Sequence, residues 1–73
     1  MEKAYNQELK RLGKKIKEIR IKKNFTQQYL SGLCDVDIRT IQRIEKGEFG
    51  IGLHILYAMA DAFSMSVSKL LED

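Results

Sequence analysis

The apolar residues of this chain recur with the spacing of helices. Near the N-terminus they step by four, three, four and three positions, through Tyr5, Leu9, Leu12, Ile16 and Ile19. Such a stripe predicts a helix that buries one face, and the polar residues at 23–24 predict its end. No segment of useful length alternates between apolar and polar with period two, the pattern of a strand. The pattern therefore predicts an all-helical fold.

A short polar corner separates the next two predicted helices, over residues 27–33 and 38–46. Thr26 and Asp37 can cap them, because each side chain can accept a hydrogen bond from a backbone N–H of the following turn. The inner face of the first of these helices is predicted to carry Tyr29, Leu30 and Leu33. The inward residues of the second are predicted to be Ile41 and Ile44.

Glycine and serine mark the remaining boundaries. Gly47 can end the third helix in a conformation with positive φ. Residues 53–63 predict a fourth helix, and Ser66 can cap a fifth over residues 67–72. No linker, repeat or low-complexity tract interrupts the pattern. We predict a single all-α domain of five helices over residues 1–73, with its core at about residues 9–72.

Size and composition limit the kind of protein this is. A chain of 73 residues fits one domain with a thin core, since a domain of this size buries only about 60% of the surface of its unfolded chain. No apolar run approaches the roughly 20 residues that span a bilayer, and the polar N-terminus has no signal-peptide pattern. The single cysteine, Cys34, cannot form an internal disulfide, which predicts a reducing, cytoplasmic location.

Positive charge is concentrated in the first predicted helix. The net charge is +3, and between residues 9 and 26 eight basic residues accompany a single acid, Glu18. The basic residues are Lys10, Arg11, Lys14, Lys15, Lys17, Arg20, Lys22 and Lys23. A basic half favours a polyanionic partner, although a solvated lysine face fits the charge equally well.

The corner between the second and third helices is a more specific signal. About three residues join them, with Val36 as the one apolar anchor, and two helices joined in this way cross steeply as a helix-turn-helix. The second helix of that unit enters the major groove of DNA. With its isoleucines inward, the outward positions of this helix are Arg39, Thr40, Gln42, Arg43 and Lys46, and Ile38 stands at its start.

These side chains suit the edges of bases. Arginine can bridge O6 and N7 of guanine, glutamine can pair with adenine, and Ile38 can touch a thymine methyl group. We predict that the residues facing base edges are Ile38, Arg39, Thr40, Gln42 and Arg43. The two acids of the corner have local roles, because Asp37 satisfies free N–H groups and Asp35 tolerates a strained turn position.

Three segments carry a family resemblance: LGKKIKEIR, FTQQYLSGLCDVDIRTIQRIEKGE and LHILYAMADAFSMSVSKLL. Together, from about residue 12 to 71, they resemble the phage-repressor and Cro-like (XRE-like) helix-turn-helix family. The resemblance implies a phosphate contact by Gln27, a contact of Lys46 with the DNA backbone, and an ion pair between Arg20 and Glu45. It also implies base-edge roles for Ile38, Arg39 and Arg43.

The chain departs from the family pattern at several positions. Asp35 and Ser64 stand where glycine is frequent, Ser31 where a residue like alanine is usual, and Ile51 where proline is common. None of these departures removes a contact residue. The one at Asp35 affects the geometry of the turn.

The fourth predicted helix is apolar almost all round. One face carries Leu53, Leu56, Tyr57, Ala60 and Phe63, and another carries Ile51, Ile55, Met59 and Ala62. In a thin domain, a helix of this kind is wholly buried or shared with a partner. We predict a homodimer whose interface includes Ile51, Ile55 and Met59.

The residues give no indication of catalysis. No set of nucleophile, base and orienting group is visible, and no Gly-rich loop is present to hold a phosphate. His54 has no second histidine or cysteine at metal-ligand spacing. We expect no enzyme activity, metal, cofactor or small-molecule ligand.

The leading interpretation is a sequence-specific regulator that binds double-stranded DNA in the cytoplasm of a bacterium or as a phage product. It would act as a dimeric repressor on an inverted-repeat operator. A protein-interaction module on the same scaffold is the alternative from another class. Among DNA-binding regulators, a phage-type repressor, a restriction-modification controller and a DNA-binding antitoxin stay open, as does activation in place of repression.

Overall fold

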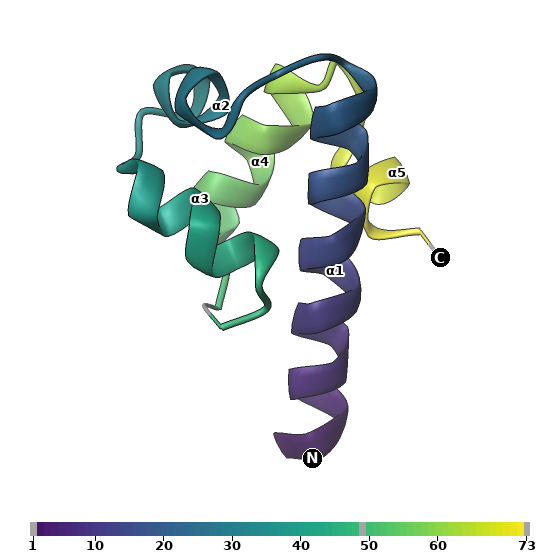
Figure 1. Ribbon diagram of the computed structural model, residues 1–73. Coiled ribbons are helices and arrows are strands. Elements are labelled where there is room, and N and C mark those ends of the chain that lie inside the picture. The colour runs from purple at the N-terminus through teal and green to yellow at the C-terminus, as the bar shows by residue number, and fades with distance from the viewer. Residues whose placement is uncertain (1, 49, 73) are drawn as a thin grey trace.

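The computed structural model describes residues 2–48 and 50–72. In these residues the chain forms five helices and no strand, which confirms the predicted all-α fold (Figure 1). The helices are α1 (Glu2–Lys22), α2 (Gln27–Cys34), α3 (Ile38–Glu45), α4 (Leu53–Ala62) and α5 (Val67–Leu71). The first turns of α1 extend beyond the other four helices, and α3 lies beside its middle (Figure 1).

Side-chain caps begin three of the helices, as predicted. The hydroxyl of Thr26 accepts a hydrogen bond from the backbone N–H of Tyr29 at 3.0 Å at the start of α2. Asp37 accepts from the N–H of Arg39 at 2.8 Å before α3. Ser66 accepts from the N–H of Lys69 at 3.0 Å before α5. Each cap stabilises its helix by about 1 kcal/mol, which matters for helices as short as these.

A residue with a left-handed backbone conformation follows each of the helices α1 to α4. Gly47 has a φ of +74° after α3, as its position predicted. Asp35 and Ser64, which replace frequent glycines of the family, have φ values of +55° and +56°. At Asp35 the N–H of the next residue, Val36, donates to the carbonyl of Ser31 at 3.0 Å and closes α2. The tight corner is therefore kept although its left-handed residue carries a side chain.

The core lies between all five helices. Its fully buried large side chains are Ile16, Leu30, Ile41, Ile44, Met59, Phe63 and Leu70. α1 packs directly against α3, and Gly13 permits this approach, because an added Cβ there would lie 2.2 Å from the carbonyl oxygen of Ile44. α3 is thus held by its inward isoleucines and by close contact with the backbone of α1.

The predicted inner face of α2 is confirmed at Leu30 and wrong at Tyr29 and Leu33. Tyr29 and Leu33 are exposed, whereas the buried residues of this helix are Leu30, Ser31 and Cys34. α2 packs against both α3 and α4, and these contacts fall on the face that carries Leu30 and Cys34, one turn apart. The ring of Tyr29 packs instead against the edge of Phe25, with centroids 4.9 Å apart.

The dimer residues predicted on α4 also need correction. Ile55 and Met59 are 8% and 0% exposed, so they belong to the core of the single chain, and Ile51 packs against that core. α4 lies between α2 and α5 and packs on both, which buries a wide stripe (Figure 1). The exposed apolar residues of α4 are Leu53 and Tyr57, at 67% and 56%. The prediction that Ile55 and Met59 form a dimer interface is therefore wrong.

Candidate nucleic-acid interface

The outer side of α3 carries the residues predicted to face base edges. Arg39 and Arg43 are exposed and lie one turn apart. The remaining predicted base-edge residues are partly buried: Ile38, Thr40 and Gln42. The structure therefore gathers the predicted reading residues on one helix, with its arginines outermost.

A buried ion pair fixes α3 to α1. Arg20 Nε lies 2.6 Å from Glu45 Oε2, and Arg20 Nη2 donates to Glu45 Oε1 at 3.2 Å. The two side chains are only 11% and 3% exposed. Arg20 Nη1 also donates to the carbonyl of Phe25 at 2.8 Å, so the loop before α2 is bound to the same group. Removing one partner of such a pair leaves an uncompensated buried charge.

Two glutamines extend this ion pair towards the surface. Gln27 Nε2 donates to Glu45 Oε1 at 3.1 Å, and Gln27 Oε1 accepts a long hydrogen bond of 3.5 Å from Gln42 Nε2. The first turn of α2 is thereby connected to the middle and end of α3. This connection was not visible in the sequence, because it depends on the angle at which the two helices cross.

A hollow of about 320 Å³ lies over these glutamines. The residues around it are Lys17, Gln27, Gln42, Glu45 and Lys46. Lys46 and the glutamines were candidates from the sequence, but Lys17 was not. Nothing in the sequence distinguished Lys17 from the other basic residues of α1, since only packing decides which of them lies next to α3.

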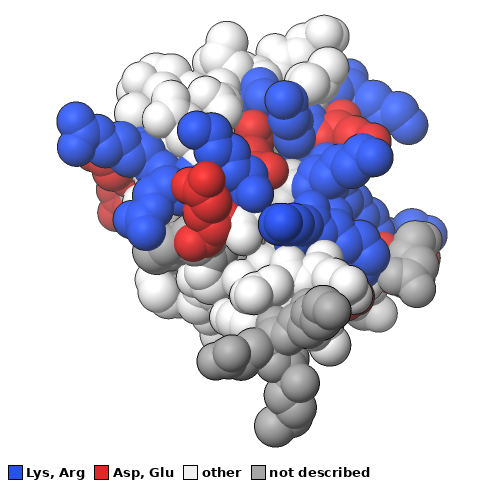
Figure 2. Space-filling model, turned by 60° about the horizontal axis from the view of Figure 1, so that its bottom comes forward, with Lys and Arg blue, Asp and Glu red and all other residues white. Residues whose placement is uncertain are grey.

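Basic side chains form a band around this region. Figure 2 shows Lys and Arg side chains spread across one face of the molecule, with a smaller number of Asp and Glu side chains between them. α1 and α3 carry most of the Lys and Arg residues of the chain, and the carboxylate of Glu45 on α3 is paired with Arg20. The face therefore has a positive potential suited to a polyanion.

Other basic residues of α1 have a structural role. Arg11 donates to the carbonyls of Leu71 and Glu72 at 3.2 and 3.3 Å, and Lys15 donates to those of Lys69 and Glu72. Cations at the C-terminal end of a helix stabilise it by meeting its free carbonyl groups. These two residues fasten α5 to α1, so not every positive charge of α1 serves a partner.

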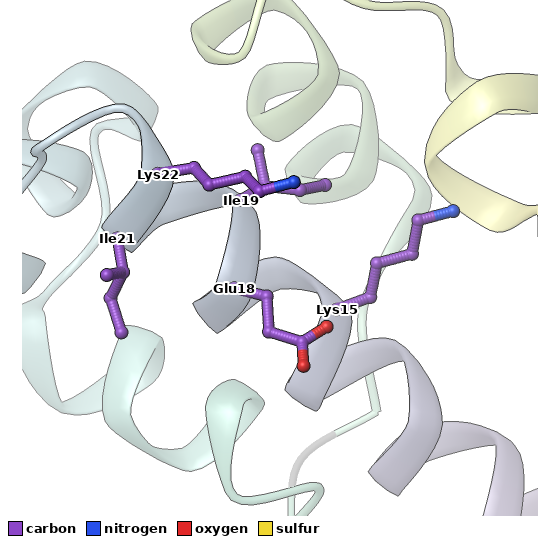
Figure 3. A pocket seen from close by; sticks show the side chains of 5 residues that line it. All are labelled: Lys15, Glu18, Ile19, Ile21 and Lys22. Atoms are coloured by element: carbon purple, nitrogen blue, oxygen red, sulfur yellow. The ribbon is translucent and has the colours of Figure 1, made fainter.

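A second hollow, of about 580 Å³, also lies on α1. Its lining residues are Lys15, Glu18, Ile19, Ile21 and Lys22. All five come from one helix, and the Lys15 side chain extends towards α5 (Figure 3). Among the described residues, its lining therefore includes no polar group from a second helix.

The described residues include few other groups that could react or bind a metal. Burial raises the pKa of the Cys34 thiol, which keeps it in its unreactive protonated form. Within residues 2–48 and 50–72, no three His, Cys, Asp or Glu side chains gather as the ligands of a metal would. Over the same residues, no helix has the length and apolar content needed to cross a membrane.

Comparisons with known proteins agree with this geometry. Residues 16–70 match the family model described as helix-turn-helix. The restriction-modification controller protein C.AhdI from Aeromonas hydrophila has a similar structure, with a TM-score of 0.82 and 24% identity over 85% of this chain and 94% of that one. The clp gene regulator ClgR from Corynebacterium glutamicum is also similar, with a TM-score of 0.84 and 22% identity over 88% of this chain and 68% of that one. No curated protein sequence matches the chain.

At these sequence identities the two solved structures establish the fold alone, whereas the match to the family model establishes the family of this chain. The family model covers α2, α3 and α4 together with the C-terminal third of α1 and most of α5. The match therefore includes the corner, the ion pair and the outward face of α3. The chain belongs to the phage-repressor and Cro-like (XRE-like) helix-turn-helix family of DNA-binding transcription regulators.

Proposed function

We propose that this protein is a sequence-specific repressor that binds double-stranded DNA as a dimer on an inverted-repeat operator in the bacterial cytoplasm. The observation that carries the proposal is the outer face of α3, where Arg39 and Arg43 stand exposed one turn apart on a helix fixed by the Arg20–Glu45 pair. A rigid helix is needed because base contacts depend on placing side chains accurately in the major groove. Bound at an operator, the protein would block polymerase.

Base reading is assigned mainly to the two arginines. An arginine that bridges O6 and N7 of a guanine contributes about 1–3 kcal/mol of discrimination. Ile38, the first residue of α3, is assigned to a thymine methyl group, and Thr40, two residues further along the helix, is assigned to a base edge. Gln27 and Lys46, from α2 and the end of α3, are assigned to the DNA backbone.

Dimerisation is proposed through the exposed apolar side of α4. Leu53 and Tyr57 lie one turn apart on this helix and are 67% and 56% exposed. Large apolar side chains paired on one face favour contact with another protein surface. A symmetric dimer would place its two reading helices about 34 Å apart, one turn of DNA.

A controller of restriction-modification genes is a second, narrower candidate. C.AhdI is such a controller, and the alignment covers 94% of its chain, so the two proteins agree over nearly its whole length. The competing class is a protein-interaction module, which the exposed apolar residues of α2 and α4 favour: Tyr29, Leu33, Leu53 and Tyr57.

Selection from a pool of random duplexes tests the proposal. We expect enrichment of an inverted repeat with half-sites about one helical turn apart, bound with a strong dependence on salt. The selected duplex and a scrambled duplex should then be compared by titration at low and moderate salt. Absence of any salt-sensitive binding at low salt would reject DNA binding and favour the protein-interaction module.

A further inference from the structure

The hollow over the two glutamines combines groups from three helices. Lys17 comes from α1 and Gln27 from α2, while Gln42, Glu45 and Lys46 come from α3 and its C-terminal cap. Lys17 and Lys46 give it two basic residues, and the exposed Arg39 and Arg43 lie on the same α3. Its polar groups therefore converge from separate elements, unlike those of the hollow on α1 alone.

Glu45 sets the direction of the hydrogen bonds in this hollow. An ionised carboxylate only accepts hydrogen bonds, so the group of Gln27 that faces Glu45 must be its NH2. The carbonyl oxygen of Gln27 is then the group that faces Gln42, and Gln42 must present its own NH2 to it. Each of these NH2 groups keeps a second N–H, because only one is used within the network. The hollow is therefore supplied with hydrogen-bond donors.

The charge of the hollow is positive. Of the described residues that line it, only Glu45 is acidic, and its side chain is paired with Arg20 and 3% exposed. Lys17 and Lys46 are exposed, and neither forms an ion pair within the part of the chain that the structure describes. Two ammonium groups and two amide donors match a ligand that is anionic and rich in acceptor oxygens.

We infer that this hollow is the seat of a single phosphate of the DNA backbone, and that Lys17 of α1 is one of its ligands. The inference rests on the proposed function and adds a contact from outside the helix-turn-helix unit. Because Lys17 belongs to α1 and Gln42 to α3, a phosphate held between them joins the two helices. Phosphate contacts carry no sequence information themselves, but they fix the register in which α3 meets the bases.

The test compares Lys17→Ala with Lys22→Ala. Both lysines are exposed and lie on α1, but Lys22 belongs to the other hollow (Figure 3). We expect Lys17→Ala to reduce the slope of log K against log salt by about 0.9, which corresponds to roughly an eightfold loss of affinity at about 0.1 M salt. The loss should be equal on the selected and the scrambled duplex. Lys22→Ala should keep the slope of the wild type.

A duplex with one methylphosphonate per half-site identifies the phosphate. Moving this uncharged group along the backbone should reveal a position that weakens the wild type more than it weakens Lys17→Ala, in which one of the ligands of that phosphate is already absent. If the wild type binds DNA and Lys17→Ala has the same salt slope as Lys22→Ala, the proposed phosphate site is rejected and the proposed function stands. If the wild type binds no duplex at low salt, both are overturned.

Discussion

Arg20 and Glu45 are 25 residues apart in sequence and form a two-point ion pair, with Nε to Oε2 at 2.6 Å and Nη2 to Oε1 at 3.2 Å. The pair joins the last turn of α1 to the last residue of α3. Glu45 also receives the amide of Gln27 from the first turn of α2. One carboxylate therefore connects the three helices that carry the candidate interface.

Replacing Glu45 by alanine should destabilise the fold. Arg20 would keep its charge in a site where its side chain is 11% exposed, and removing one partner of a buried pair costs about 3–5 kcal/mol. Urea unfolding followed by circular dichroism measures the change. The matched control is Glu18→Ala, an exposed acid of α1, which should alter stability by less than about 0.5 kcal/mol. Equal effects of the two substitutions would contradict this account.

Arg43→Ala should lower affinity for the selected site by about 1–3 kcal/mol and relax the preference at one base pair. Binding to a scrambled duplex should fall much less, because the phosphate contacts remain. Lys46→Ala should weaken binding to both duplexes alike and lower the salt slope by about one unit. Titration of both variants at two salt concentrations separates these effects. An equal loss on both duplexes for Arg43→Ala would show that this residue positions the protein without reading sequence.

The two sides of α4 should respond differently to substitution. Met59 is 0% exposed, so Met59→Ala should cost about 2–5 kcal/mol of stability through the cavity it leaves. Tyr57 is 56% exposed, so Tyr57→Lys should weaken self-association and leave the stability of the single chain nearly unchanged. Urea unfolding checks the first, and sedimentation at tens of micromolar (an order-of-magnitude range in which weak dimers form) checks the second. A wild type that sediments as a monomer there would refute the proposed dimer.

Cys34 should react slowly in the folded protein. Burial raises the pKa of its thiol above the ordinary value of 9.0, and the thiolate is the reactive form. Alkylation by iodoacetamide at pH 8 should be much slower than in the urea-unfolded chain. At a pH below the pKa that the thiol has in the unfolded chain, it is protonated in both states and leaves the stability unchanged. At a pH above that value, the unfolded chain loses the proton more readily, so the stability of the fold should decrease as the pH rises. Alkylation at equal rates in the folded and unfolded chains would show that the thiol is accessible.

Two aspartates of the same corner should give opposite results. Asp35 has a φ of +55°, so Asp35→Gly should relieve strain and stabilise the protein by at most about 1 kcal/mol. Asp37 accepts the hydrogen bond that caps α3, so Asp37→Ala should destabilise it by about 1 kcal/mol. Thermal unfolding of both variants measures the difference. Destabilisation by Asp35→Gly would mean that its side chain supports the turn beyond tolerating the left-handed conformation.

The sequence by itself determined the features that depend on neighbouring residues. Thr26, Asp37 and Ser66 cap their helices as predicted, and Gly47 ends α3 with positive φ. These features rely on hydrogen bonds and backbone preferences within a single turn. Ile41 and Ile44 were also predicted to be buried, because apart from Ile38 at its start the rest of α3 is polar.

Only the tertiary structure decided which side of α4 is buried, which basic residue of α1 lies beside α3, and how Gln27 meets Gln42. α4 offers apolar residues on more than one side, so packing by α2 and α5 selects Ile55 and Met59 for the core and leaves Leu53 and Tyr57 exposed. Lys17 has the same local character as its neighbours and differs only in what packs beside it. Periodicity fixes the angle between residues of one helix, whereas contacts between helices depend on how distant segments pack, which no local pattern contains.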